Sequence, residues 1–213
     1  MDFIDKKIED YARAFTSPES DVMSELNRET YLNKLQPRML SGHIQGSFLK
    51  MISQMIKPKN ILEIGTYTGY SAIALASGLA KGGKLTTLEF NEEHEQMANE
   101  FFTKAGVDDR IEMKIGDATK LIPTLDKQWD LVFIDADKNN YSVYYDLVFD
   151  AVPSGGWILA DNVLWSGKVL LDDEDLDEDT RAIKAFNKKV MADDRVENMI
   201  LPFRDGLLLI RKL

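Results

Sequence analysis

Residues 60–72 read NILEIGTYTGYSA, and this stretch decides the fold. Its first five residues form a short apolar run that is typical of a buried strand. Glycines at 65 and 69 interrupt the pattern, and the segment that follows, YSAIALASGLA, is helix-like. A strand, a glycine-containing turn and a helix in this order are typical of doubly wound α/β folds, which bind ligands at the carboxyl edge of the sheet.

The same alternation continues along the chain. Strand-like runs begin at residues 84 (KLTTLEF), 110 (RIEMKIG), 129 (WDLVFIDA) and 155 (GGWILADN), and each is followed by a helix-like stretch or a loop. This order indicates a mostly parallel sheet with helices on both faces. Two last strand candidates, 195–203 and 206–213, are separated by an Asp-Gly turn that joins neighbours antiparallel. We expect a Rossmann-like, doubly wound α/β sheet of seven strands that ends in a C-terminal antiparallel hairpin.

The segment before the alternation, residues 1–57, is expected to add N-terminal helices. Its S-P-E sequence at 17–19 suits a helix cap with proline at the first helical position. Four apolar residues recur at helical spacing: Ile4, Ile8, Tyr11 and Phe15. With 213 residues and 44% hydrophobic content, the chain suits a single domain, 1–213, better than two.

Composition restricts the compartment and the partners. The 26 basic and 36 acidic residues give a net charge of -10, which disfavours attraction to nucleic acid or anionic lipid. The chain has no cysteine, which excludes disulfides, thiolate metal sites and a cysteine nucleophile. No signal-peptide apolar region is visible, and no apolar run approaches the roughly 20 residues that span a bilayer. We therefore expect a soluble, cytoplasmic protein without a membrane partner.

The turn after the first strand lacks the glycines that dinucleotide-binding proteins use. Counted from Gly65, the second and third glycines of G-x-G-x-x-G are replaced by Tyr67 and Tyr70. A dinucleotide needs the backbone to approach its pyrophosphate, so this pattern argues against NAD, FAD and a dehydrogenase. A nucleoside cofactor without phosphates does not need those glycines.

Polar residues at the ends of the next two strands suit such a nucleoside. Glu89 ends a strand about 20 residues beyond the glycine turn, where a carboxylate can accept hydrogen bonds from both ribose hydroxyls. The third strand is followed by Gly116, Asp117 and Ala118, whose short polar side chain and backbone could meet an adenine edge. Together, at three successive strand ends, these features predict a nucleoside-binding site.

Strands four and five become polar only where they emerge from the sheet. Asp135 ends the fourth strand, and Asp161 and Asn162 end the fifth. Three oxygen donors at adjacent strand ends predict a hard-cation site for Mg²⁺, Mn²⁺ or Ca²⁺, whereas zinc prefers nitrogen or sulfur. The alternative is that these residues are ordinary polar strand ends.

Lys138 lies three residues beyond Asp135, so its flexible side chain can reach the same site. A lysine beside a divalent cation loses its proton more readily, which suits a general base. The alternative is an exposed surface lysine that carries little packing.

Two features stay outside the predicted site. The acidic run DDEDLDED at 172–179 lacks the central glycine and spacing of a calcium loop, and is interpreted as a solvated loop that caps the next helix. His43 and His94 have no partner that the sequence reveals and are assigned no role.

In combination, these motifs resemble the cation-dependent class I O-methyltransferases, which include plant caffeoyl-coenzyme A enzymes, animal catechol enzymes and many bacterial relatives. The resemblance extends from about Leu40 to the C-terminus. It is carried by EIGTYTGYSA at 63–72, the acid of TTLEF at 89, GDA at 116–118, FIDADKNNY at 133–141, GGWILADNVLWSG at 155–167 and DGLLLIRK at 205–212.

The resemblance implies a reaction and the residues that support it. The cofactor is S-adenosylmethionine, the acceptor is one hydroxyl of a catechol-like phenolic small molecule, and the enzyme is a homodimer. The implied cofactor residues are Ser41, Glu63, Gly65, Thr66, Ser71, Glu89, Ala118 and Asp135, beside the Asp117 noted above. The implied metal ligands are Asp135, Asp161 and Asn162, the base is Lys138, and Ser166 contacts the substrate.

Two other functions fit the same residues. One is methylation of a hydroxylated tRNA uridine, which the charge of -10 disfavours. The other is a module that binds the nucleoside without catalysis, which would not need the strand-end residues Asp135, Lys138, Asp161 and Asn162.

Overall fold

The computed structural model describes residues 5–213, so Ile4 of the predicted first helix lies outside the described residues. Hydrogen bonds order the strands of the described chain as β3-β2-β1-β4-β5-β7-β6 in one seven-stranded sheet. The strands are β1 (Asn60–Ile64), β2 (Lys84–Glu89), β3 (Ile111–Ile115), β4 (Leu131–Ile134), β5 (Trp157–Asp161), β6 (Val196–Leu201) and β7 (Leu207–Lys212).

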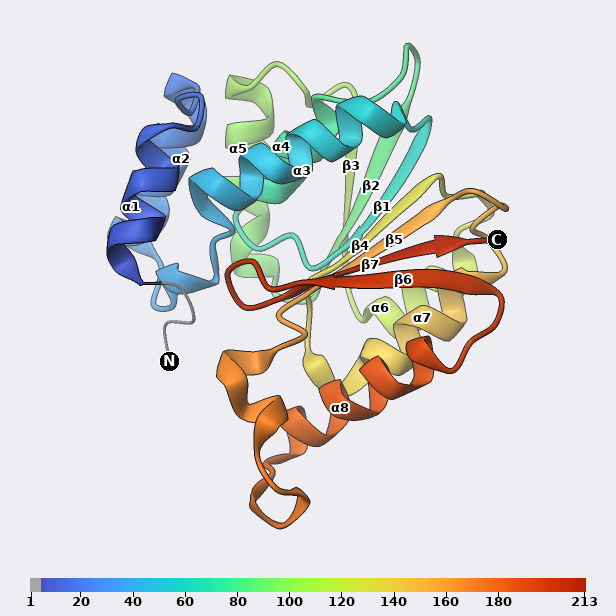
Figure 1. Ribbon diagram of the computed structural model, residues 1–213. Coiled ribbons are helices and arrows are strands. Elements are labelled where there is room, and N and C mark those ends of the chain that lie inside the picture. The colour runs from blue at the N-terminus through green and yellow to red at the C-terminus, as the bar shows by residue number, and fades with distance from the viewer. Residues whose placement is uncertain (1–4) are drawn as a thin grey trace. The chain divides into compact units, whose positions relative to one another are not determined.

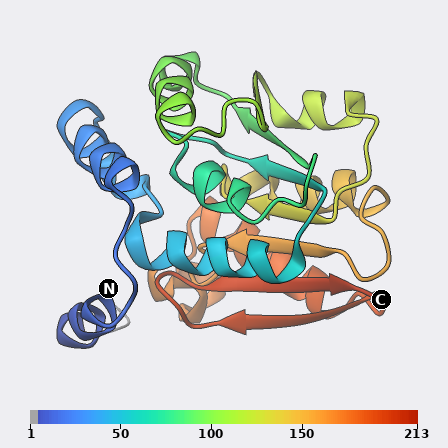
Figure 2. The same ribbon diagram turned by 90° about the horizontal axis from the view of Figure 1, so that it is seen from above.

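The pairing within this sheet confirms the predicted fold class. β1 pairs with β2, β2 with β3 and β4 with β5, all in parallel. β7 runs antiparallel to both β5 and β6, as the Asp-Gly turn predicts. Figure 2 shows this antiparallel pair, drawn in red, with its two arrows pointing in opposite directions.

By its contacts the described chain divides into two compact units, residues 7–118 and residues 119–213 with residues 5 and 6. Each is described by itself below. That the chain forms a single domain with an N-terminal helical region at 1–57 stays a prediction.

In the 7–118 unit, helices cover a core of parallel strands (Figure 1). α4 contacts both α3 and β2, and α5 contacts β3. The core includes Leu62, Leu75 and Leu85, which are fully buried. The helices are α1 (Lys6–Ala14), α2 (Asp21–Asn33), α3 (Gly42–Ile56), α4 (Tyr70–Ala76) and α5 (Glu95–Lys104).

The structure corrects the predicted start of α2. The N-cap is Ser20, whose hydroxyl accepts the N–H of Met23 at 3.4 Å, and not the Ser17 of the S-P-E sequence. The carboxylate of Glu19 accepts a hydrogen bond from the hydroxyl of Tyr70. Proline therefore lies before the helix rather than in its first turn.

In the 119–213 unit, α7 (Tyr141–Phe149) packs on β4 and on α8 (Glu178–Met191), and α8 also contacts β6 (Figure 1). The short α6 (Ala118–Leu121) begins at the boundary of the two units. The aromatic core includes Phe186, whose ring meets that of Tyr141 edge-on with centroids 5.5 Å apart.

The acidic run before α8 caps this helix, as the sequence indicates. Asp177 is the N-cap, and its Oδ1 accepts the N–H of Thr180 at 2.8 Å. Its Oδ2 pairs with Lys168 at 2.6 Å. The Lys168 ammonium and the Thr180 donors hold the pKa of Asp177 well below its usual range.

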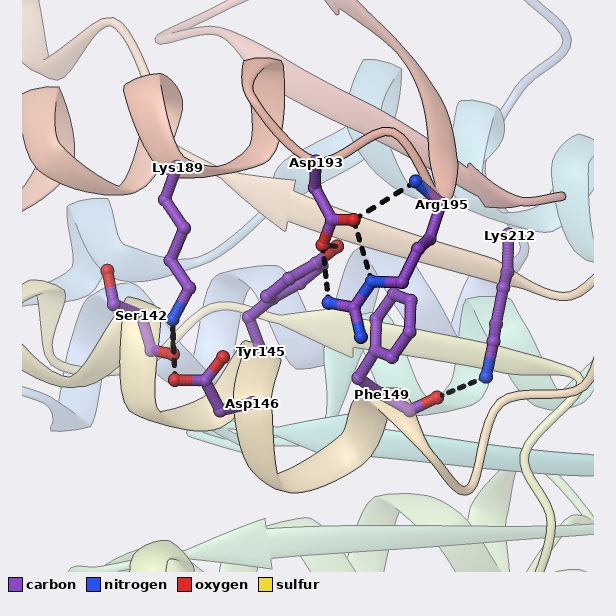
Figure 3. Close-up of polar contacts among 8 residues, drawn as sticks. All are labelled: Ser142, Tyr145, Asp146, Phe149, Lys189, Asp193, Arg195 and Lys212. Atoms are coloured by element: carbon purple, nitrogen blue, oxygen red, sulfur yellow. Dashed lines mark hydrogen bonds and ion pairs between the residues drawn. The ribbon is translucent and has the colours of Figure 1, made fainter.

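Figure 3 shows a polar cluster that fastens the C-terminal hairpin to α7. Asp193 accepts the hydroxyl of Tyr145 at 2.9 Å and two N–H groups of Arg195 at 2.8 and 2.6 Å. The Arg195 guanidinium lies 3.8 Å from the centroid of the Phe149 ring. Lys212 donates to the Phe149 carbonyl at 2.8 Å, which adds a bond from the end of β7.

We expect Asp193→Asn to lower the free energy of unfolding at neutral pH by about 1 to 3 kcal/mol, the range for hydrogen bonds to charged groups. Arg195 lowers the pKa of Asp193, so its carboxylate stabilises the fold above the unfolded aspartate pKa of about 3.9. That contribution disappears as the pH falls through the lower folded pKa. The deficit of Asp193→Asn should therefore shrink in urea unfolding below about pH 4. Asp194→Asn, at the exposed neighbouring position, is the control, and an equal deficit there would contradict the assignment.

Candidate functional site

A buried hydrogen-bond chain lies at the carboxyl ends of β1 and β2. Glu63 is fully buried, and its Oε2 accepts the hydroxyl of Thr87 at 2.5 Å. The hydroxyls of Thr87 and Thr66 are also 2.5 Å apart. This series of hydrogen bonds holds two of the predicted cofactor residues, Glu63 and Thr66, through Thr87, a residue that the sequence motifs did not indicate.

The turn between β1 and α4 needs its two glycines. Gly65 has φ +100°, which L side chains rarely adopt, and its N–H donates to the Leu88 carbonyl at 2.9 Å. Gly69 has φ +91°, and a Cβ there would lie 2.6 Å from the Phe102 ring. The turn is therefore drawn tightly against β2 and α5.

The carboxylate of Glu89, at the end of β2, is held by neighbours that we call the Glu89 cluster: Tyr67, Asn91 and His94. Its Oε2 accepts the N–H of Tyr67 at 2.7 Å, and its Oε1 accepts the N–H of Asn91 at 2.9 Å. His94 Nδ1 lies 3.4 Å from Oε1. A carboxylate offers about four lone-pair sites, so Glu89 keeps acceptor capacity for further donors.

His94 therefore has the partners that the sequence did not reveal. Besides the contact with Glu89, its ring meets the Tyr67 ring edge-on, with centroids 4.8 Å apart. His43 is buried, and its Nε2 lies 2.7 Å from the Ser17 carbonyl oxygen, which ties α3 to the segment before α2. Both histidines thus have partners that the sequence alone did not reveal.

The other predicted cofactor residues of this unit lie at element ends. Ser41 is the N-cap residue of α3, Ser71 lies in the first turn of α4, and both are buried. Asp117 and Ala118 are half-buried and follow β3, where Gly116 donates its N–H to the Glu89 carbonyl at 2.8 Å. Asp135 belongs to the other unit.

In the 119–213 unit, Lys138 is the centre of a second group, the Lys138 cluster, with Asp135, Tyr141 and Asp161. Its Nζ donates to Asp135 Oδ1 at 3.3 Å and to the Tyr141 hydroxyl at 2.6 Å. It also lies 4.7 and 5.7 Å from the ring centroids of Tyr141 and Trp165. Only 8% of Lys138 is exposed, so the alternative of an exposed surface lysine is wrong.

The local backbone explains why Lys138 lies against Tyr141. Residues 138–140 form a 3₁₀ turn that leads directly into α7, which brings Lys138 and the first residue of α7, Tyr141, within hydrogen-bond distance. Tyr141 is fully buried and donates its hydroxyl to the Asp161 carbonyl at 3.0 Å. Burial, with Asp135 and Asp161 nearby, raises its pKa, so this hydroxyl keeps its proton. Tyr141 thus connects Lys138 to the end of β5.

The donor set at these strand ends has the chemistry that a hard cation requires. Asp161 is buried at the last position of β5, and Asn162 follows it with φ +58°, a left-handed conformation that asparagine tolerates. Among residues 5–213, no group of three or more His, Cys, Asp or Glu side chains could hold a metal ion. The predicted set has two carboxylates and one amide, so it fits Mg²⁺ or Ca²⁺ with positions left for water or substrate, and not zinc.

The loop after β5 carries the predicted substrate residue. Trp165, Ser166 and Gly167 all have positive φ, and the Ser166 N–H donates to Asp205 Oδ1 at 2.5 Å. Burial raises the pKa of Asp205. The contact with Asp205 fixes the backbone and leaves Ser166 exposed, so its contact with substrate stays a prediction.

A family model described as O-methyltransferase matches residues 13–213. The chain belongs to this O-methyltransferase family. The match begins before the Leu40 expected from the motifs, so it also includes α2.

The methyltransferase is similar to named relatives along almost its whole length. It is 36% identical over 208 residues to the probable caffeoyl-CoA O-methyltransferase 2 of Dictyostelium discoideum, covering 95% of this chain and 90% of the relative. With the caffeoyl-CoA O-methyltransferase of Medicago sativa it shares 34% identity over 206 residues, covering 92% and 83%. The O-methyltransferase of Bacillus cereus in complex with SAH superposes with a TM-score of 0.90 at 30% identity, covering 97% of each chain. The enzyme is an S-adenosylmethionine-dependent O-methyltransferase.

Sequence reasoning missed the residues that hold the predicted ones in place, Tyr67 through its backbone N–H and the others through their side chains. They are Tyr67, Thr87, His94 and Tyr141. Two of them stand inside quoted motifs, Tyr67 in EIGTYTGYSA and Tyr141 at the end of FIDADKNNY. Their contacts depend on residues up to 31 positions away along the chain, which no local pattern reveals.

We expect Glu89→Ala to weaken the binding of S-adenosylmethionine by the methyltransferase by about 1.5 to 3 kcal/mol, the scale of charge-assisted hydrogen bonds lost from a buried carboxylate. Isothermal titration calorimetry measures this loss. Glu93→Ala, an exposed acid four residues on, is the control. Unchanged affinity in Glu89→Ala would remove the assignment of this carboxylate to the ribose.

Proposed function

We propose that this enzyme transfers the methyl group of S-adenosylmethionine to one hydroxyl of a catechol-like small molecule, with a divalent cation at Asp135, Asp161 and Asn162. The observation that carries the proposal is the Lys138 cluster, in which a buried amine lies beside a carboxylate at the end of β4. A structural lysine would more commonly keep its charge in water. The relatives named caffeoyl-CoA O-methyltransferases support an acceptor with two adjacent hydroxyls.

The cofactor is proposed to lie at the Glu89 cluster and the turn before α4. Glu89 would accept both ribose hydroxyls, and Asp117 with Ala118 would meet the adenine edge. The remaining proposed contacts are Ser41, Glu63, Gly65, Thr66, Ser71 and Asp135.

Lys138 is proposed as the general base. The cation, when bound, supplies positive charge that lowers the pKa of an acceptor hydroxyl. As the base, the Lys138 amine would take the hydroxyl proton, and the Tyr141 hydroxyl and Asp135 hold that amine in place. As the acceptor oxygen bonds to the methyl carbon, the carbon–sulfur bond breaks and its electron pair stays on sulfur, which becomes neutral. Positioning and a dry, preorganised site supply most of the acceleration.

The remaining expectations concern assembly and alternatives. We propose a homodimer, and exposed apolar side chains such as Ile8, Tyr11 and Met55 are compatible with a second copy as partner. None of the described helices is long and apolar enough to cross a membrane. Separately, we propose a cytoplasmic location. A hydroxylated tRNA uridine is the alternative acceptor, and the net charge of -10 disfavours it.

We expect Asp161→Asn to reduce turnover of a catechol at least about 100-fold, because it removes one of two carboxylates from the donor set. S-adenosylmethionine affinity, measured by calorimetry, should change less than about twofold, since Asp161 is not among the proposed cofactor contacts. Excess EDTA should stop wild-type turnover, and added Mg²⁺ should restore it. Asp150→Asn, an exposed aspartate after α7, is the control. Full turnover in EDTA after dialysis would show that these oxygens serve the fold only.

Lys138→Met should reduce the rate constant of methyl transfer by roughly 10²- to 10⁴-fold, the range for general-base catalysis. Methionine keeps most of the buried stem, and a melting temperature measured alongside reports any packing loss. Arginine should not restore the rate, because a guanidinium stays protonated. The measurement is single-turnover methylation of a catechol between pH 6 and 9, and the deficit should shrink as the acceptor hydroxyl ionises without help. Equal rates at pH 7 would exclude Lys138 as the base.

A further inference from the structure

Tyr67 has a backbone conformation that is uncommon for a bulky residue. Its φ is +52°, in the left-handed region. This conformation costs free energy for every residue except glycine, and the cost is smaller for asparagine and aspartate than for bulky residues. Such conformations persist where neighbouring contacts hold them, and they concentrate at ligand sites. Dinucleotide-binding turns use glycine at this position, so the chain keeps a conformation that glycine would adopt freely and adds a large side chain to it.

The backbone N–H and the side-chain hydroxyl of Tyr67 both form hydrogen bonds. Its N–H donates to Glu89 Oε2 at 2.7 Å, and its hydroxyl donates to the Gln36 carbonyl at 3.1 Å. Between these ends, its ring lies against His94, which in turn lies 3.4 Å from the other oxygen of Glu89. One residue therefore contacts the proposed ribose acid and the segment that leads from Gln36 to Ser41.

Two further hydrogen bonds also connect the residues after β1 and β2 to α2 and the residue that follows it. Thr68 shares a buried hydrogen bond of 3.0 Å with Thr30 of α2, and Lys34 donates to the Glu93 carbonyl at 3.0 Å. The Gln36–Ser41 segment itself joins α2 to α3, and the backbone N–H groups of Met39 and Leu40 close it into a single 3₁₀ turn. Most of its residues are not buried, and Met39 is 54% exposed, so the segment has little packing of its own to hold it.

We propose that Tyr67 is a positioning residue that sets Glu89 and the Gln36–Ser41 segment in one arrangement, so that binding of the cofactor and ordering of this segment are coupled. The left-handed well is narrow, so the direction of the N–H and that of the side chain are fixed together. A ligand that holds Glu89 therefore favours the backbone that also brings the hydroxyl to Gln36. By linkage, ordering the segment strengthens cofactor binding by the same factor. The inference rests on the proposed role of Glu89 toward the ribose.

Tyr67→Phe tests the coupling, because it keeps the ring and the backbone and removes only the hydroxyl. S-adenosylhomocysteine, titrated by calorimetry without metal or acceptor, should bind Tyr67→Phe about 3- to 10-fold more weakly, the size expected for one hydrogen bond. In hydrogen exchange, this ligand should protect residues 34–41 in the wild type and protect them less in Tyr67→Phe. A merely structural tyrosine would lower the melting temperature and leave this ligand-dependent protection unchanged.

Two further variants separate the proposed coupling from a general effect of losing a hydroxyl or a side chain. Tyr70→Phe loses a comparable hydroxyl contact, but to Glu19, which lies outside the 34–41 segment, so its affinity should stay within about twofold of wild type. Tyr67→Asn adopts the left-handed conformation readily and keeps the N–H, so it should fold and lose the protection of 34–41. An affinity of Tyr67→Phe within twofold of wild type, with full protection of 34–41, overturns the proposal. Since neither measurement uses an acceptor or a metal, failure of catechol methylation would overturn the proposed reaction and leave this coupling standing.

Discussion

Burying a charged group requires that its hydrogen-bonding atoms find partners, and this requirement shapes both groups of functional side chains. Glu63, Glu89, Lys138 and Asp161 are each at least nine-tenths buried at or just beyond strand ends. Thr87 donates a hydrogen bond to Glu63, two backbone N–H groups donate to Glu89, and the Tyr141 hydroxyl accepts a hydrogen bond from Lys138. These partners are uncharged, whereas Lys138 also forms an ion pair with Asp135 at 3.3 Å and Glu89 lies 3.4 Å from His94. The uncharged partners hold the buried groups in place without supplying an opposite charge.

The strands of this fold were predictable because each is a short apolar run bounded by turn residues. NILEI, LVFI and WILAD appear in the structure with bounds within two residues of the predicted runs. The candidate residues lie at the carboxyl ends of such strands because parallel strands all end at the same edge of the sheet, where these folds bind ligands. The Asp-Gly turn similarly predicted the pairing of β6 and β7.

Contacts between distant residues could not be predicted in the same way. The amine of Lys138 lies 5.7 Å from the ring centroid of Trp165 in the loop after β5, and a local pattern shows only a lysine after a strand. α2 begins after Ser20 and not after Ser17, and the neighbouring Glu19 accepts a hydrogen bond from Tyr70, 51 positions away. The positive φ of Tyr67 likewise occurs together with two contacts to distant residues, whereas its residue type predicts a negative φ.

The position of β7 has a consequence for how the chain folds. The last strand in sequence lies between β5 and β6, and the Gly155 N–H donates to the Lys212 carbonyl at 2.8 Å, near the final residue. During folding, β5 therefore lacks its antiparallel neighbour until residues 207–212 are available to pair with it. An unpaired strand edge invites pairing with other chains. In the 119–213 unit, the edge of β5 is thus open to misassembly until β7, which follows every other strand in sequence, pairs with it.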